Sequence, residues 1–263
     1  MSATISSINY CPVKSVSFQT IEKCEIKKDV GIIGDRIFAF AKDLDIDKAQ
    51  LFEKSPEERK GKWNKVLTLK NSPVLNKYNF LFKDNKLTLT FKDKEILTIN
   101  SSELSERQLL SNKIIELENS LKEPIVLMKN EESPFFDTSI SNKVDFVNSV
   151  SLLNIQSIND FQKKIDKKVE ISRFRGNICI DGVKPWEERE WIGKIIKINN
   201  VSFRVEKNIP RCVAINLKPT TDDNSLNLLQ SLKKTYDHFE MGIYLTALDD
   251  GKIEVGNKIE TNK

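Results

Sequence analysis

The sequence is poor in the side chains that usually hold metal clusters. It contains a single histidine, His238, and its four cysteines are scattered, with no CxxC pair. This pattern excludes a zinc finger and a cysteine-ligated iron–sulfur cluster of the usual spacing. Any cysteine chemistry must therefore use one thiolate, from Cys11, Cys24, Cys179 or Cys212.

Long apolar runs and a strong net charge are also missing. The first residues, MSATISSINYCPVK, lack the basic start and apolar core of a signal peptide, and no later run approaches membrane-spanning length. The formal net charge is only +4, because 42 Lys and Arg are nearly matched by 38 Asp and Glu. The basic stretch KKIDKKVEISRFR at 163–175 is typical of a solvated face. We therefore expect a cytoplasmic protein with no disulfides and no nucleic-acid or membrane partner.

The chain has 263 residues, which is long enough for two modest domains or one large one and for a buried core. Two segments with helical period, 101–122 and 151–165, predict amphipathic helices, and the first starts near Asn100 and Glu103. Strands are predicted at 36–41, 66–70, 87–92, 95–99, 145–150, 176–182, 194–205, 212–217, 242–248 and 252–259, with a further helix at 225–234. Many strands with few helices predict an α+β fold with barrel-like sheets. We expect the helix at 101–122 to join two units, residues 1–124 and 125–263.

Basic residues beside turns are candidates for binding an anion. PVKS places Lys14 and Ser15 after a proline, and GIIGDR places Arg36 at the start of a strand. In SRFRGN, alternation would put Arg173 and Arg175 on one side of an extended segment, followed by Asn177. Guanidinium forks match phosphate geometry, so that these residues and Arg211 would form a phosphate clamp. Each of them taken alone is more simply explained as a solvated or ion-paired surface residue.

Cys212 follows Arg211 at the expected start of a strand, in IPRCVAINL. A thiol binds metal or attacks only as the thiolate, which a neighbouring cation favours. The alternative is a structural cysteine in a strand, which is also how we interpret Cys179. His238 lacks a partner that would make it a base, and we expect Trp186 and Trp191 to pack rather than to bind a ligand.

Taken in order, these motifs resemble the MOSC family, in the version preceded by a MOSC N-terminal β-barrel domain. The resemblance rests on PVKS, GDR, FVNSVSLLNIQ, FRGNI, the W....W.G run, RC and DDGKIEVGNKI, and it covers nearly the whole chain. It implies two barrel-like domains, a MOSC N-terminal domain over 1–124 and a MOSC domain over 125–263, with a few peripheral helices. Among its members the chain is similar to the amidoxime-reducing components. Two departures stand out: Cys11 replaces the aromatic or histidine that commonly precedes PVKS, and Gly176 replaces a proline.

The resemblance also implies a cofactor and a site. Cys212 would be the catalytic residue and the ligand of molybdenum, for which a soft thiolate is suited. The contacts to the pterin and phosphate of the molybdenum cofactor would come from both domains, with the cofactor between them. They are Lys14, Ser15, Arg36, Asn148, Ser149, Arg175, Asn177, Arg211 and Tyr244. Whether this anion pocket is like one for pyridoxal phosphate stays open.

The function implied is a molybdenum-cofactor oxidoreductase that reduces N-hydroxylated compounds, such as hydroxylamines, amidoximes and N-hydroxylated bases, to amines or amidines. Because the chain ends soon after its last strand, we expect electrons from a separate protein of ferredoxin, flavoprotein or cytochrome type. Two alternatives stay open at this point. One is a sulfur carrier with a persulfide on Cys212, and the other is a non-catalytic module that binds or delivers the cofactor.

Overall fold

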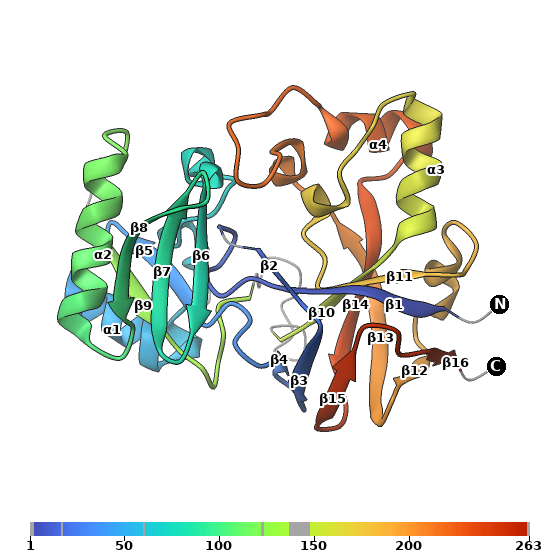
Figure 1. Cartoon of the computed structure of the whole chain (residues 1–263), viewed down its shortest axis with the longest axis horizontal. Coiled ribbons are helices and arrows are strands. Elements are labelled where there is room, and N and C mark those ends of the chain that lie inside the picture. The colour runs from blue at the N-terminus through green and yellow to red at the C-terminus, as the bar shows by residue number, and fades with distance from the viewer. Residues whose placement is uncertain (1–2, 17, 60, 122–123, 137–147, 262–263) are drawn as a thin grey trace.

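The computed structural model describes residues 3–16, 18–59, 61–121, 124–136 and 148–261 (Figure 1). The predicted α+β class is confirmed, with the helices lying at the periphery of the sheets. The helices are α1 (Ile46–Lys54), α2 (Leu104–Leu117), α3 (Ile155–Ile165) and α4 (Leu228–Tyr236). The strands are β1 (Thr4–Tyr10), β2 (Gln19–Ile21), β3 (Lys23–Lys27), β4 (Gly31–Ile32), β5 (Phe38–Lys42), β6 (Tyr78–Lys83), β7 (Lys86–Phe91), β8 (Lys94–Asn100), β9 (Ile125–Lys129), β10 (Val150–Asn154), β11 (Ile178–Asp181), β12 (Ile195–Ile198), β13 (Val201–Pro210), β14 (Glu240–Ala247), β15 (Gly251–Glu254) and β16 (Ile259–Thr261).

Two sheets and the helices α3 and α4 form the larger part of the molecule. We call this part the large unit. One sheet has eight strands in the order β16-β12-β13-β14-β10-β11-β1-β2, and the other is β15-β3-β4. They share one apolar core, to which the small sheet gives Ile26 and Ile253 and the large sheet gives Phe203 and Leu245. Strand β10 is buried at every position because it pairs with β11 on one side and β14 on the other, as expected of a central strand.

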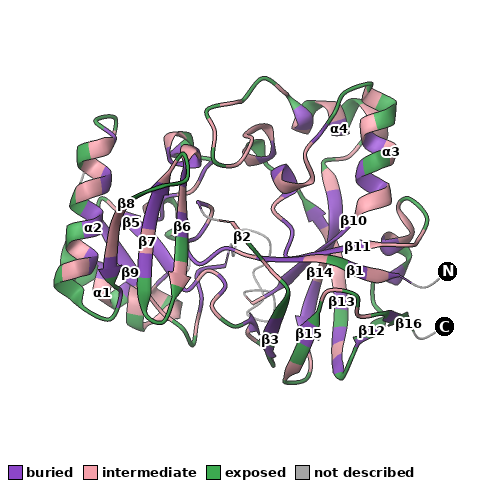
Figure 2. Ribbon diagram, in the orientation of Figure 1, coloured by how far each residue is buried: buried purple, intermediate pink, exposed green. Residues whose placement is uncertain are grey.

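The remaining strands and helices form a second body, which we call the small unit. It contains the pair β5-β9, the three-stranded sheet β6-β7-β8, and the helices α1 and α2. Phe38, Phe40 and Phe80 lie at the centre of its core, which α2 closes with Leu110. In Figure 2 the buried residues follow the strands of both units, whereas the helices alternate between buried and exposed residues.

The two units are interleaved along the chain. Strands β1 and β2 belong to the eight-stranded sheet, β3 and β4 pair with β15, and β9 pairs with β5. The domain boundary between residues 124 and 125 stays a prediction. In each sheet of the described strands, the first and the last strand do not pair with each other. The predicted barrel-like sheets are therefore not closed into barrels among these strands. No helix in the described ranges is long and apolar enough to cross a membrane.

Several local predictions were wrong, and each has a physical reason. The run 66–70 is not a strand, because Asn71 caps a turn there by accepting from Thr68 N at 2.8 Å. The predicted helix at 151–165 begins at Ile155, because SLLN is the buried end of β10. Helix α2 begins after Glu103, while Asn100 ends β8 and accepts from Ser102 N. Residues 145–147 of the predicted strand at 145–150 lie outside the described residues.

Candidate functional site

A cavity of about 370 Å³ brings together most of the residues selected from the sequence. Its walls come from the loop after β1, the turn before β5, the start of β10, the turn before β11, the end of β13 and the middle of β14. It is lined by Cys11, Lys14, Ser15, Phe18, Arg36, Phe136, Ser149, Ser151, Arg173, Phe174, Arg175, Asn177, Ile209, Pro210, Arg211, Cys212, Ala214, Ile215 and Tyr244. Of the ten predicted site residues, only Asn148 is not in this lining. Its side-chain amide donates to Asp29 O at 2.7 Å.

The lining is strongly cationic. It contains one lysine and four arginines, and none of the described residues in it is acidic. Burying charges of one sign together is costly unless an opposite charge compensates them. The cavity is therefore suited to an anion with several acceptor oxygens, such as a phosphate group.

Arg36 is held by the buried carboxylate of Asp35, just behind the lining. Asp35 is only 1% exposed, pairs with the Arg36 guanidinium and accepts from Cys11 N at 2.7 Å. Burial raises the pKa of the Asp35 carboxyl, and Arg36 opposes this rise. Arg36 itself has a left-handed backbone, with φ of 56°, and its guanidinium lies 5.2 Å from the centre of the Phe136 ring.

Asn177 connects this pair to the large sheet. Its Oδ1 accepts from the backbone N and the hydroxyl of Ser151, at 3.0 and 2.7 Å. Its Nδ2 donates to Asp35 Oδ2 at 3.2 Å. Asn177, whose predicted contact with the cofactor stays a prediction, thus joins the start of β10 to the turn that carries Arg36.

Arg175 reaches into the cavity from a turn that only a small residue can follow. Its φ is 49°, and a Cβ at the next residue, Gly176, would lie 2.4 Å from the Leu153 side chain. Arg175 donates to Ser15 O at 3.2 Å and to Asn76 Oδ1 at 2.6 Å, while its Nε is buried with no hydrogen-bond partner among the described residues. Burial lowers its pKa to about 10. The glycine that replaces proline therefore packs tightly against β10.

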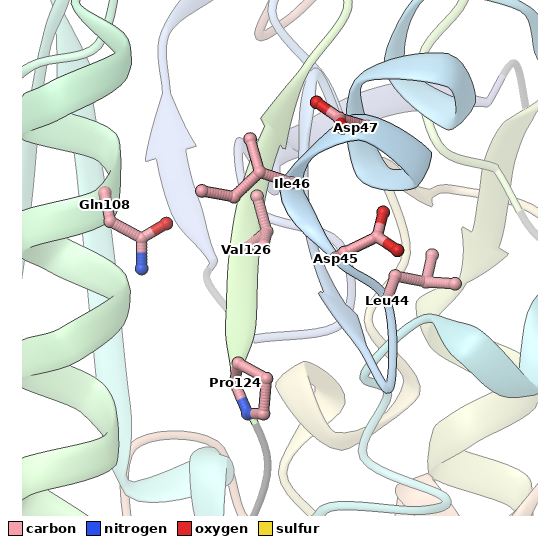
Figure 3. Close-up of a pocket in the computed structure, with 7 residues that line it drawn as sticks. All are labelled: Leu44, Asp45, Ile46, Asp47, Gln108, Pro124 and Val126. Atoms are coloured by element: carbon pink, nitrogen blue, oxygen red, sulfur yellow. The ribbon is translucent and has the colours of Figure 1, made fainter.

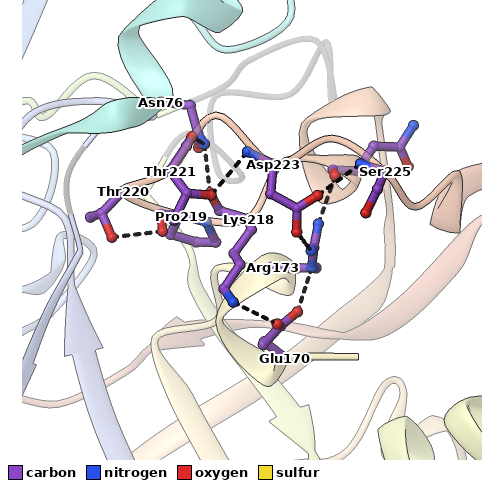
Figure 4. A network of polar contacts seen from close by, with 10 residues as sticks. Asn76, Glu170, Arg173, Lys218, Pro219, Thr220, Thr221, Asp223 and Ser225 are labelled. Atoms are coloured by element: carbon purple, nitrogen blue, oxygen red, sulfur yellow. Dashed lines mark hydrogen bonds and ion pairs between the residues drawn. The ribbon is translucent and has the colours of Figure 1, made fainter. Parts of the chain in front are cut away.

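Arg173, two residues earlier, does not share the role predicted for it. The segment Ile171–Phe174 is a 3-10 turn rather than an extended strand, so that the two arginines diverge. Arg173 is 1% exposed and donates to Glu170 and Asp223 at 2.6 and 2.7 Å, and to Asn216 O at 2.7 Å. Figure 4 shows Arg173 between these two carboxylates. Its charge is compensated within the protein.

Cys212 lies where β13 has ended. The strand stops at Pro210, and Cys212 precedes a 3-10 turn over Val213–Asn216, so that the predicted strand at 212–217 was wrong. The backbone of Cys212 is extended, and its side chain is exposed at the cavity. The other three cysteines are buried. Cys212 is thus the thiol that a molecule in the cavity can reach from solvent.

Arg211 is locked beside it. Its guanidinium donates to Met241 O at 2.8 Å and to Phe174 O at 2.7 Å, and burial lowers its pKa to about 10. A Cβ at Gly242 would lie 3.3 Å from the guanidinium and 2.4 Å from Leu152 O. Because Gly242 has no Cβ, β14 can approach β10 closely and the Arg211 side chain has room beside it.

The remaining cysteines and aromatic residues fit structural roles. Cys179 is 2% exposed within β11, as expected, and burial raises the pKa of Cys24 to about 12. Trp186 packs against Tyr236 with ring centres 4.5 Å apart, and His238 accepts from Glu240 N at 3.1 Å. No group of three or more His, Cys, Asp or Glu side chains within the described ranges could hold a metal ion.

Sequence reasoning missed several residues of the site. Cys11 lies in the lining, where its thiol is 3.0 Å from Val13 O. Ser151 holds Asn177, whereas Asp35 and Asn76 hold Arg36 and Arg175. A signal existed for two of them, because Cys11 directly precedes PVKS and Asp35 is the central residue of GDR. Nothing in the sequence distinguishes Asn76, which lies far from every motif.

A second hollow, of about 540 Å³, lies on the small unit (Figure 3). It is formed around the start of α1, one residue of α2 and the start of β9. Among the described residues of its lining there are two carboxylates and no cation or thiol. It is lined by Leu44, Asp45, Ile46, Asp47, Gln108, Pro124 and Val126. We therefore place the candidate site at the cationic cavity.

Comparison with known proteins gives this cavity a context. Residues 143–260 match the model of the MOSC domain. The chain is 26% identical over 159 residues to mitochondrial amidoxime reducing component 2 of Bos taurus. The aligned region covers 56% of this chain and 46% of the relative. The chain is also 29% identical over 118 residues to molybdenum cofactor sulfurase of Drosophila willistoni, in an alignment that covers 43% of this chain and 14% of the relative. The chain thus spans less than half the length of each of these relatives.

Solved structures were compared as well. The YuaD protein from Bacillus subtilis aligns over 99% of this chain and 96% of its own, with a TM-score of 0.43 and 10% identity. YiiM from Escherichia coli aligns over 43% of this chain and 54% of its own, with a TM-score of 0.34 and 14% identity. The domain match confirms the MOSC resemblance over residues 143–260, and the MOSC N-terminal domain over 1–124 stays a prediction.

Proposed function

We propose that this chain binds the molybdenum cofactor in the cationic cavity and reduces N-hydroxylated compounds with electrons from a separate redox protein. The observation that carries the proposal is one cavity that joins an exposed thiol, Cys212, to a lining with five cationic side chains. The MOSC match and relatives named for amidoxime reduction and for the molybdenum cofactor support it.

The residues present fit such a group. A pterin with a phosphate needs several donors, and the buried Nε of Arg175 is a donor with no hydrogen-bond partner in the part of the chain that the structure describes. Lys14, Ser15, Arg36, Ser149, Asn177, Arg211 and Tyr244 would complete the binding site. Asn148 would take part only through its neighbour Ser149. The cofactor would thus lie between the two predicted domains, 1–124 and 125–263.

Cys212 would be the metal ligand, because a soft thiolate suits molybdenum. When bound, the cofactor would supply the two-electron chemistry that removes the substrate oxygen. The protein would hold it through the arginines and leave the Cys212 side open to substrate and donor. Since the described lining has neither histidine nor carboxylate, we assign no general base to the protein.

The test is turnover of benzamidoxime to benzamidine by protein from a cofactor-competent host, with reduced methyl viologen in place of the donor protein. We expect activity in the wild type and in Cys24→Ala, whose cysteine is buried in β3 away from the cavity. We expect a loss of at least about a hundredfold in Cys212→Ser. Equal activity in Cys212→Ser and the wild type would refute the assignment of Cys212.

A second candidate function rests on the exposure of Cys212 and on the relatives named as sulfurases. In it, Cys212 carries a persulfide and passes sulfur on. Intact mass spectrometry of the native protein separates the two functions. A reducible gain of one sulfur on Cys212 without bound pterin supports the carrier, and bound pterin with molybdenum supports the reductase. Bound pterin with molybdenum but no turnover would indicate a delivery module.

A further inference from the structure

Asn76 is a buried residue of the small unit that contacts the large unit with both ends of its side chain. It lies in the 3-10 turn Pro73–Lys77 and is 2% exposed. Its Oδ1 accepts from Arg175 Nη2 at 2.6 Å, and its Nδ2 donates to Lys218 O at 2.6 Å and Thr221 O at 2.7 Å. One amide therefore bridges the cavity and the loop that follows the Cys212 turn.

The Arg175 end of this bridge has few other supports. Besides Asn76, the guanidinium donates only to Ser15 O at 3.2 Å, and its Nε has no partner among the described residues. No carboxylate in the described structure pairs with it. The orientation of this charge in the cavity therefore depends largely on the Asn76 oxygen.

The loop end is held from two sides. Residues 218–225 are fixed to the large unit by Arg173, which pairs with Asp223, and by Lys218, whose Nζ is 3.0 Å from Glu170. They are fixed to the small unit by Asn76, which also accepts from Thr220 N at 2.9 Å through its backbone oxygen. Figure 4 shows Asn76 reaching this loop at the end opposite Glu170.

We infer that Asn76 is a positioning residue that holds the Arg175 guanidinium in the cavity and couples an anion bound there to the order of loop 218–225. Because one amide holds both partners, an anion that fixes Arg175 also fixes the Asn76 oxygen, and through the Asn76 nitrogen it fixes the loop. The inference rests on the proposed function only in treating the cavity as an anion site, and its tests use full-length protein free of metal and pterin.

The first test separates the two ends of the amide with two variants. Asn76→Ala removes both, whereas Asn76→Asp keeps the acceptor for Arg175 but loses the donor to Lys218 and Thr221. We expect hydrogen exchange of the peptide covering 217–226 to accelerate about tenfold in both variants. Modification of Arg175 by phenylglyoxal, located by peptide mapping, should accelerate only in Asn76→Ala. Inorganic pyrophosphate should bind Asn76→Ala about tenfold more weakly than the wild type.

A matched control separates positioning from stability. Asn71, five residues earlier in the same unit, also bonds backbone groups with both ends of its amide, but contacts neither Arg175 nor loop 218–225. Asn71→Ala should leave all three readouts within about twofold of the wild type. If Asn76→Asp and Asn76→Ala change the exchange and modification rates together, in proportion to their melting temperatures, Asn76 is only structural and the inference is overturned.

The second test needs no Asn76 variant. Pyrophosphate should slow exchange of the 217–226 peptide in the wild type at least about threefold, and should not do so in Arg175→Met. Exchange that does not respond to pyrophosphate in the wild type, although calorimetry shows binding, would overturn the coupling. Because no readout involves molybdenum or turnover, a failed proposed function leaves these outcomes interpretable.

Discussion

Two regions of the molecule are built on arginines only two residues apart, and they differ in what compensates the charge. Around Arg173, two carboxylates and a backbone oxygen each accept a hydrogen bond from one of the three guanidinium nitrogens. Around Arg175, the described partners are two neutral oxygens, and Nε has no partner within the described ranges. The first region is a completed structural network, and the second has room for an anion. For these two arginines, the carboxylate partners rather than the shared motif distinguish a stabilising role from a binding role.

The largest effect on stability should come from removing the compensated arginine. Arg173→Met leaves Glu170 and Asp223 without their buried partner, and we expect the free energy of unfolding to fall by about 2–3 kcal/mol. Arg189→Met is the control, because its pair with Glu240 is about a third exposed and should cost less than about 1 kcal/mol. Urea denaturation of both variants measures the difference. Equal losses would remove the distinction between the two kinds of pair.

The turn that carries Arg175 should be the next most sensitive place. Gly176→Ala puts a Cβ 2.4 Å from the buried Leu153 side chain, so that β10 or the turn must shift. We expect a loss of about 2 kcal/mol of unfolding free energy together with weaker pyrophosphate binding. An unfolding free energy equal to that of the wild type would show that the turn can move to accommodate the Cβ, contrary to the tight packing described above.

Removing the uncompensated arginine should have a different outcome. Arg175→Met deletes a half-buried charge that has no carboxylate partner among the described residues, so that we expect the unfolding free energy to change by less than about 1 kcal/mol. Pyrophosphate affinity, measured by calorimetry, should fall about tenfold or more. A variant that is strongly destabilised but still binds pyrophosphate normally would reverse the assignment of the two arginines.

The smallest predicted effect is a pH dependence confined to the Arg173 network. Hydrogen bonding from Arg173 lowers the pKa of Glu170 from 4.5 to about 2. Because the folded pKa lies below the unfolded one, the ionised Glu170 stabilises the fold above pH 4.5, and this stabilisation is lost as the pH falls toward 2. The melting temperatures of the wild type and Glu170→Gln should therefore converge over this range. A constant difference at all pH values would contradict the assignment.

The sequence predicted the parts of the fold that depend on local pattern. Apolar alternation bounded by turn signals located β5, β7, β8 and β14, although β5 and β14 are buried at most of their positions. It misassigned 151–154, because a strand buried on both faces has no alternation, and a short apolar run is compatible with a helix. It misassigned 212–217, because the chain leaves the sheet at Pro210 for a turn that holds Cys212 at the cavity.

The site was predictable where a motif carries the residue, and only there. Nine of the ten residues chosen from motifs line one cavity, although Lys14 and Tyr244 are far apart in sequence. The role of Arg173 was mistaken because its partners Glu170 and Asp223 are brought together only by the fold. Asn76 was missed for the same reason, since its contacts lie about a hundred residues or more away.

The most direct test of the central claim is the molybdenum and pterin content of the wild type beside Cys212→Ser and Arg175→Met, each expressed in a cofactor-competent host. We expect molybdenum and pterin near one per chain in the wild type. We also expect altered sulfur coordination of the metal in Cys212→Ser, by X-ray absorption, and less pterin in Arg175→Met. Wild-type protein with neither molybdenum nor pterin, or a Cys212→Ser variant with unchanged metal coordination, would contradict it.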